Sequence, residues 1–138
     1  FKIMHNNIQA LRDILKSAKT IAVVGLSAQW NRPSYFAAKY MQAHGYKIIP
    51  VNPSCSEILG EPCYPDLSSI PVPVDMVNVF RKSEDCLDVA HEAVKIGAKS
   101  LWLQMGVINQ EALDYASSHG LTGIMDKCLM VEHRKLGL

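Results

Sequence analysis

A chain of 138 residues that is 49% hydrophobic and 20% charged has the size and composition of one globular domain, so we expect a single domain over residues 1–138. Its 14 basic and 13 acidic residues are spread along the chain and leave a net charge of +1, which argues against a nucleic-acid partner or a membrane surface as partner. No apolar run approaches the ~20 residues that span a bilayer, and the first residues lack the apolar core of a signal peptide. We therefore expect a cytoplasmic protein.

The N-terminal third of the chain predicts helix, strand, helix and strand. Asn7 can cap a helix over residues 8–17, whose apolar stripe would cover an edge or a face of a sheet. A β-branched run predicts a strand over residues 20–24, and an amphipathic helix is expected over residues 34–44. A second strand is expected over residues 47–51.

A proline-rich segment, residues 52–73, follows the second strand. Its prolines exclude a long regular helix, although residues 54–59 and 66–70 could form short turns. We expect a crossover that is mostly loop.

The remainder of the chain alternates three more strands with three helices. The expected elements are a strand over 75–80, a helix capped by Ser83-Glu84-Asp85 that ends at Gly97, a strand over 100–104, a helix from Asn109 to 118, a strand over 123–125 and a helix over 129–136. Apolar strands separated by helices indicate an α/β fold with one parallel sheet of about five strands, covered by helices on both faces. Right-handed crossovers favour a doubly wound order, 3-2-1-4-5, in which ligands bind beyond the carboxyl ends of the strands.

Cysteine and histidine spacing favours neither a metal site nor dithiol chemistry. The four cysteines, which form no CxxC pair, are Cys55, Cys63, Cys86 and Cys128. His44 and His119 each precede a glycine at an expected helix end, where an imidazole can bind the last carbonyls. We expect these two histidines to cap helices.

The turn after the first strand has the residue types of an anion site. Gly25 lets the backbone approach a phosphate, Ser27 and Ser34 can donate O–H bonds, and Arg32 adds a planar charged group. Pro33 can begin the following helix without losing a hydrogen bond. The alternative is a tight turn in which Gly25 serves packing alone and Arg32 is solvated. The spacing is Gly-x-Ser rather than GxGxxG, which makes an NAD-type loop less favoured without excluding it.

Six segments in order carry a resemblance to a known family. They are VVGLSAQWNRPSY at 23–35, IIPVNP at 48–53, GEPCYPDL at 60–67, VDMVNVFRKSED at 74–85, LWLQMGV at 101–107 and DKCLMVEHRKL at 126–136. Together they resemble the stand-alone CoA-binding domain proteins, which are single Rossmann-like domains similar to the CoA-binding domain of the succinyl-CoA synthetase alpha subunit. The resemblance implies a Rossmann-like sheet that binds coenzyme A or an acyl-CoA at the carboxyl ends of its strands.

The end of the second strand bears on the choice between CoA and NAD. An NAD-type site normally places Asp or Glu there, roughly 20 residues beyond the glycines. This chain has Asn52-Pro53 instead, and the missing carboxylate also removes a charge that would repel a 3′-phosphate such as CoA carries. This favours CoA, although Asn-Pro is also a common turn opener.

The resemblance also implies contacts from the later loops. Val79, Phe80 and Arg81 should flank the adenine, with Phe80 offering a ring face and Arg81 a second cation. Gln104 and Gly106 could present an amide and exposed backbone to the pantetheine arm. The alternatives are a solvated Arg81 ahead of the next helix and a buried turn at 104–106.

Catalytic residues are not apparent at this predicted mouth. No Ser-His-Asp order, paired carboxylates or metal cluster converges there, and the synthetases to which the family is similar carry their phosphorylated histidine in other domains. We expect a non-catalytic binding or sensor module for CoA or acyl-CoA. Two alternatives stay open: an NAD(H)-binding sensor or oxidoreductase of the same fold, and a CoA-binding subunit of a multi-chain acyl-CoA enzyme. A homodimer or a partner subunit also stays open.

Overall fold

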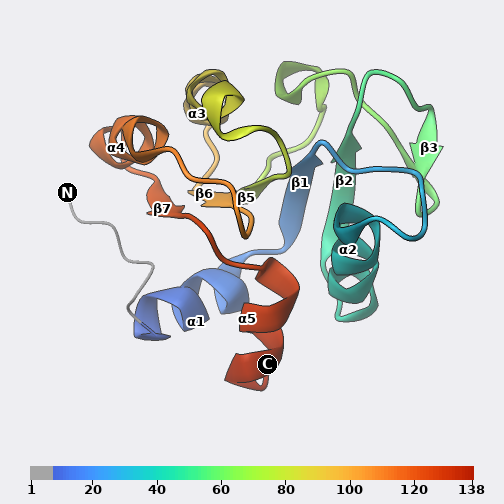
Figure 1. The fold of residues 1–138 in the computed structure, drawn as a ribbon, viewed down its shortest axis with the longest axis horizontal. Coiled ribbons are helices and arrows are strands. Elements are labelled where there is room, and N and C mark those ends of the chain that lie inside the picture. Colours follow the sequence, from blue (N-terminus) through green and yellow to red (C-terminus); the bar gives the residue numbers. More distant parts are fainter. Residues whose placement is uncertain (1–7) are drawn as a thin grey trace.

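The computed structural model describes residues 8–138, so the expected cap at Asn7 lies outside the described residues. Figure 1 shows one sheet with helices on both of its faces. The five strands of this sheet are β1 (Thr20–Val24), β2 (Lys47–Val51), β5 (Met76–Val79), β6 (Ser100–Leu103) and β7 (Thr122–Ile124). All four strand pairs are parallel, which confirms the predicted α/β fold class.

The order of the five strands is β2-β1-β5-β6-β7, which corrects one part of the prediction. We expected the strand at 75–80 outside the second strand, but β5 pairs with β1. The edge position beside β2 is held by a single residue, Tyr64, which bridges in parallel to Val51. Pro62, two residues before Tyr64, and Pro50 of β2 both lack the N–H donors that would extend this ladder toward residue 62. The order 3-2-1-4-5 describes the sheet when Tyr64 is counted as its third strand, with β7 following as a sixth.

The crossover contains a small hairpin that the sequence prediction did not include. Strands β3 (Glu57–Ile58) and β4 (Glu61–Pro62) pair antiparallel where a short turn over 54–59 was expected. Leu59 and Gly60 join them with φ of 56° and 77°. Positive φ at both central residues is the geometry of a tight hairpin turn.

Two 3₁₀ turns precede and follow β5. The turn expected over 66–70 is η1 (Leu67–Ser69), in which Asp66 accepts a hydrogen bond from the Ser69 N–H at 2.9 Å. The second, η2 (Ser83–Asp85), stands where we predicted a helix cap, yet no side chain caps it or the helix that follows. Ser83 instead holds the loop after β6, as described below.

The helices form two layers. Those on one face are α1 (Ile8–Ser17), α2 (Pro33–Ala43) and α5 (Leu129–Leu136), and those on the other are α3 (Cys86–Lys95) and α4 (Gln110–Ser118) (Figure 1). Because side chains alternate along a strand, Ile21 and Val23 pack under the first layer and Ala22 and Val24 under the second. Among residues 8–138 no helix is both long and apolar enough to cross a bilayer.

Three predicted helix ends are confirmed by their hydrogen bonds. The Asn109 side chain accepts the Ala112 N–H at 2.9 Å and so begins α4. The rings of His44 and His119 each lie within hydrogen-bond distance of a carbonyl four residues earlier, at 2.8 and 2.9 Å. Imidazole capping of α2 and α4 is therefore the role of these two histidines.

The winding of the sheet reverses between β1 and β5. The chain passes from β1 through α2 to β2 on one side, and then returns across β1 to β5. In open α/β sheets the ligand crevice lies outside the carboxyl ends of the strands at such a reversal. The candidate site is therefore the edge where β1 and β5 end.

Candidate functional site

The chain turns sharply at Gly25, directly after β1. Its φ is +88°, and a Cβ at this position would lie 2.5 Å from the carbonyl oxygen of Phe80 and 3.3 Å from Cδ of Arg81. The Gly25 N–H donates to the Val51 carbonyl at 3.0 Å. Only glycine fits this position, both for its conformation and for the close approach of the chain leaving β5. The packing role considered from the sequence is thus present, and it places Arg81 against the turn.

Two serine hydroxyls hold the loop between β1 and α2. The buried Ser34 accepts the Ser27 N–H at 3.0 Å, and the Ser27 hydroxyl accepts the Gln29 N–H at 3.1 Å. A hydroxyl that accepts one bond still has its own O–H to donate. Both serines therefore order the loop and keep a donor, although Ser34 has little exposed surface from which to offer it.

Arg32 lies immediately before α2 and is exposed. Its side chain forms no ion pair or hydrogen bond with another residue in the described part of the chain. Pro33 is the first residue of α2, as predicted, and no side chain caps this helix start. The positive end of the α2 dipole and an unpaired guanidinium thus lie together next to the loop.

Asn52 joins the loops that follow β1 and β2. Its side-chain amide donates to the Leu26 carbonyl at 2.9 Å and accepts the Ser54 N–H at 2.8 Å. Pro53, beside it, is exposed. The position therefore has a structural role, and it carries no charge toward the crevice.

The three residues at the end of β5 differ in exposure. Val79 is fully buried in the core beneath α3, which leaves only its backbone near the crevice. Phe80 is half-buried, and Arg81 is exposed and pairs with Asp85 at 3.4 Å. An exposed pair of this kind is worth less than about 1 kcal/mol, so the Arg81 guanidinium can leave it for a stronger anion.

Gln104 and Gly106 are both engaged with neighbouring loops. The buried Gln104 side chain accepts from the Asn78 amide at 3.3 Å and from the Leu129 N–H at 3.4 Å. The exposed Gly106 donates its N–H to a carboxylate oxygen of Asp126 at 2.7 Å. Gln104 therefore ties β6 to β5 and to the start of α5, while Gly106 keeps only its carbonyl free.

Hydrogen bonds and close contacts link all five loops into one carboxyl-edge rim. Asn52 joins the loop after β2 to that after β1, and the contact of Gly25 with Phe80 joins that after β1 to that after β5. Ser83 joins the loop after β5 to that after β6, because its hydroxyl accepts the Ile108 N–H at 3.0 Å. Asp126 joins the loop after β7 to that after β6 by accepting the Gly106 N–H.

The carboxyl-edge rim is open rather than deep. A cavity of about 60 Å³ lies under it between Val24, Val51 and Arg81. Ligand pockets are typically ~300–1,000 Å³, so this cavity cannot enclose a nucleotide. A nucleotide would lie along the rim, in contact with its loops.

Sequence reasoning missed Ser83 as part of the rim, and it placed Asp126 at the end of the last strand without giving its partner, Gly106. Ser83 looked like a helix cap, and its true partner lies 25 residues away. Asp126 has φ of +60°, a left-handed conformation that Asp tolerates better than most residues. Its only sequence signal was an acid placed directly after the last strand.

Reactive groups near the carboxyl-edge rim are few. Cys86, at the start of α3, is buried, and burial followed by the charge of Asp85 raises its pKa to about 11. Its thiol contacts the Lys82 carbonyl at 3.4 Å and stays protonated at neutral pH. In residues 8–138 no three His, Cys, Asp or Glu side chains are grouped so as to hold a metal ion.

Similar proteins share both sequence and fold with this chain. The uncharacterized protein YneT of Bacillus subtilis (strain 168) is 45% identical over 123 residues, which cover 89% of this chain and 91% of that protein. A solved structure of a hypothetical protein from Pyrococcus horikoshii OT3 has a TM-score of 0.94 and 34% identity, over 100% of this chain and 98% of that one.

A larger enzyme contains a similar region. The acetate–CoA ligase [ADP-forming] II of Archaeoglobus fulgidus is 29% identical over 126 residues, which are 83% of this chain and 19% of the ligase. The chain thus spans about a fifth of that enzyme. A family profile described as the CoA binding domain matches residues 19–134, and the chain accordingly belongs to the CoA binding domain family.

Proposed function

We propose that this protein binds coenzyme A or an acyl-CoA along the carboxyl-edge rim and does so as a binding or sensor module without chemistry of its own. The observation that carries the proposal is the pairing of a glycine turn with two arginines at the reversal of the sheet. Arg32 has no partner among the described residues, and Arg81 lies against Gly25. The family of the chain agrees with this ligand.

The phosphates of CoA match the charge at the start of α2. A pyrophosphate there would meet the Arg32 guanidinium, the uncapped helix end and the Ser27 hydroxyl. The uncharged Asn52 at the end of β2 leaves room for a 3′-phosphate where an NAD-type site would have a carboxylate. These features support CoA over NAD.

Binding without reaction is supported by how the polar groups of the carboxyl-edge rim are used. Asn52, Gln104 and Asp126 are each hydrogen-bonded to other loops. His133 follows the last strand but is turned away, with its ring bonded to Tyr40. No general base is therefore free beside the proposed phosphate loop in the described part of the chain.

A second candidate is a subunit that acts with another chain. Trp30 and Phe36, beside the phosphate loop, are 78% and 46% exposed and border a hollow of about 360 Å³. Exposed aromatic residues of this kind mark contact surfaces. Native pull-down followed by mass spectrometry tests this candidate, and a single recurrent partner lost on Trp30→Ser would favour it.

The decisive experiment for CoA is isothermal titration of the reduced protein with CoA, acetyl-CoA, dephospho-CoA and NAD. We expect CoA to bind at micromolar concentration or tighter and dephospho-CoA to bind more weakly. Arg32→Ala should weaken CoA by about 10-fold or more, because a charge-assisted hydrogen bond contributes roughly 1.5–3 kcal/mol. Lys95→Ala, which removes an exposed cation from α3, is the matched control and should bind like wild type. Binding of NAD but not CoA would overturn the proposal.

A further inference from the structure

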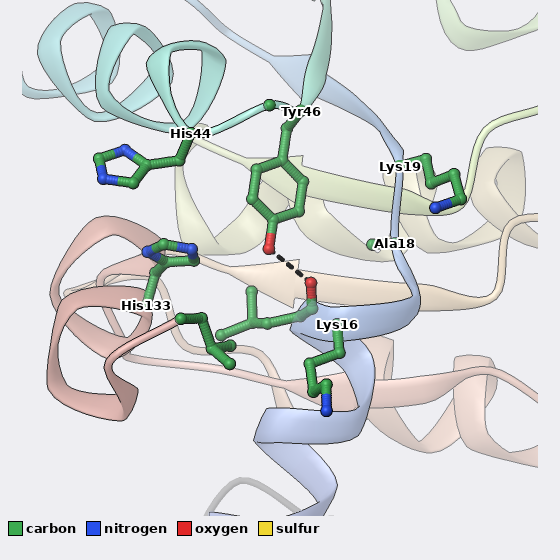
Figure 2. Close-up of a pocket in the computed structure, with 9 residues that line it drawn as sticks. Lys16, Ala18, Lys19, His44, Tyr46 and His133 are labelled. Carbon is green, nitrogen blue, oxygen red and sulfur yellow. Dashed lines mark hydrogen bonds between the residues drawn. The ribbon is translucent and has the colours of Figure 1, made fainter.

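A second hollow lies at the opposite edge of the sheet, where the strands begin. It has a volume of about 330 Å³. Lys16 borders it from the end of α1, Lys19 from the link to β1, His44 and Tyr46 from the turn after α2, and His133 from α5 (Figure 2). Because Lys19 and Tyr46 directly precede β1 and β2, the strands separate this amino-edge hollow from the carboxyl-edge rim.

His133 gives the amino-edge hollow a buried polar group. His133 is only 2% exposed, and its Nδ1 lies 2.9 Å from the Tyr40 hydroxyl. Nε2 has no hydrogen-bond partner among the described residues, and Figure 2 shows the ring directed toward Tyr46. When the Tyr40 hydroxyl donates to Nδ1, the ring proton is on Nε2, which then faces the hollow as a donor.

The walls of the hollow are fixed by aromatic contacts. The His133 ring meets His44 and Tyr46 edge to face, with centroids 5.0 and 5.7 Å apart. His44 stacks on Tyr40 at 4.1 Å, and the Tyr46 hydroxyl donates to the Leu15 carbonyl, as Figure 2 shows. A ligand would therefore enter a preformed site and pay little to order it.

The charged side chains that border the hollow are both lysines. Lys16 and Lys19 are exposed, and neither forms an ion pair with another residue of the described chain. No Asp or Glu is among the residues that border the hollow. Figure 2 shows the two lysines on one side of Tyr46 and the two histidines on the other. The flexible lysine stems can bring the ammonium groups over the mouth of the hollow.

We propose that the amino-edge hollow is a binding site for a small organic carboxylate. The carboxylate accepts a hydrogen bond from Nε2 of His133 and is neutralised by Lys16 and Lys19, while the carbon body lies against Leu15 and the Tyr46 ring. The volume is at the lower end of the ~300–1,000 Å³ of ligand pockets, which suits a ligand far smaller than CoA. Leu15 and the Tyr46 ring on the wall of the hollow can contact a carbon body, which favours an organic acid over an inorganic anion.

The test is a titration of the folded protein, labelled with ¹⁵N-histidine, with benzoate, benzamide and inorganic phosphate, followed by the His133 ring signals. We expect a saturable shift with benzoate and at least 10-fold weaker binding of benzamide, which has the same shape but no charge. The double variant Lys16→Gln and Lys19→Gln should weaken benzoate by about 10-fold, and Lys95→Gln should not.

Four results would contradict the proposed carboxylate site. No saturable benzoate shift, equal binding of benzamide, a response to phosphate alone, or no effect of the lysine changes would each overturn the proposal. The lysine variants alter exposed side chains only, so they remain informative where a change at His133 unfolds the protein. The proposal does not rest on the proposed function: added CoA should leave the benzoate titration unchanged, whether or not CoA binds at the carboxyl-edge rim.

Discussion

At Gly25 two separate physical demands fall on one residue. The left-handed φ of +88° would cost any L-residue roughly 1–2 kcal/mol. The backbone carbonyl oxygen of Phe80, 2.5 Å from the place of a Cβ, adds a steric overlap to this strain. Gly120 has a similar φ of +90° but no atom within 4 Å of a Cβ, so it carries the first demand without the second.

We expect Gly25→Ala to lower the free energy of unfolding by at least about 2 kcal/mol, because strain and steric overlap add. Gly120→Ala, the matched control, should cost only about 1 kcal/mol, from strain alone. Urea denaturation of both variants measures the difference. Equal losses would show that the approach of Phe80 to Gly25 has no energetic consequence.

At the level of the elements, the start of α4 is held by one local and one remote hydrogen bond of Asn109. Asn109 caps α4 through its carbonyl oxygen, as predicted, while its amide nitrogen donates to the Ser83 carbonyl at 2.8 Å. The first bond is local and readable from the sequence. The second joins residues 26 apart and helps to hold the carboxyl-edge rim.

We expect Asn109→Ala to destabilise the protein by about 1–2 kcal/mol, because it removes the cap and the Ser83 contact together. Asn109→Ser keeps a capping oxygen and should recover about half of that loss. Thermal or urea unfolding of the two variants decides. If serine is as damaging as alanine, the cap is not what Asn109 contributes.

At the scale of the whole molecule, the ends of three helices meet at the amino-edge hollow. Burial, and then the neighbouring His44, lowers the pKa of His133 below its ordinary value near 6.5. The folded protein thus holds the neutral ring, whereas the unfolded chain takes up a proton near pH 6.5. The neutral ring therefore contributes its full stabilisation at pH values above the pKa of the unfolded chain. This contribution is lost progressively as the pH falls toward the lower pKa of the folded protein.

The free energy of unfolding should therefore decrease between pH 7 and pH 5 with a contribution from His133. His133→Gln keeps polar atoms at the site but cannot titrate in this range, so its profile should be flatter than that of wild type. Denaturation measured at intervals of pH gives both profiles. Parallel profiles would mean that His133 is not held neutral by the fold.

The elements of the fold could be predicted because their signals are local. Periodicity, caps and glycine stops placed each main helix and strand within about two residues, as at α4 with Asn109. The exceptions depend on remote contacts: Tyr64 holds the edge beside β2 because prolines interrupt its pairing, and η2 has no cap because Ser83 bonds to the loop after β6.

The sequence alone determined the α/β class, the turn at Gly25 and the loops in which Arg32 and Arg81 lie, since patterning and a glycine-only conformation act over a few residues. Tertiary structure decided how the polar groups are used. It engaged Asn52 and Gln104 in holding loops together, and it buried Val79. It also built the amino-edge hollow, in which Tyr40 and His133 meet across 93 residues, because only packing brings such distant side chains together.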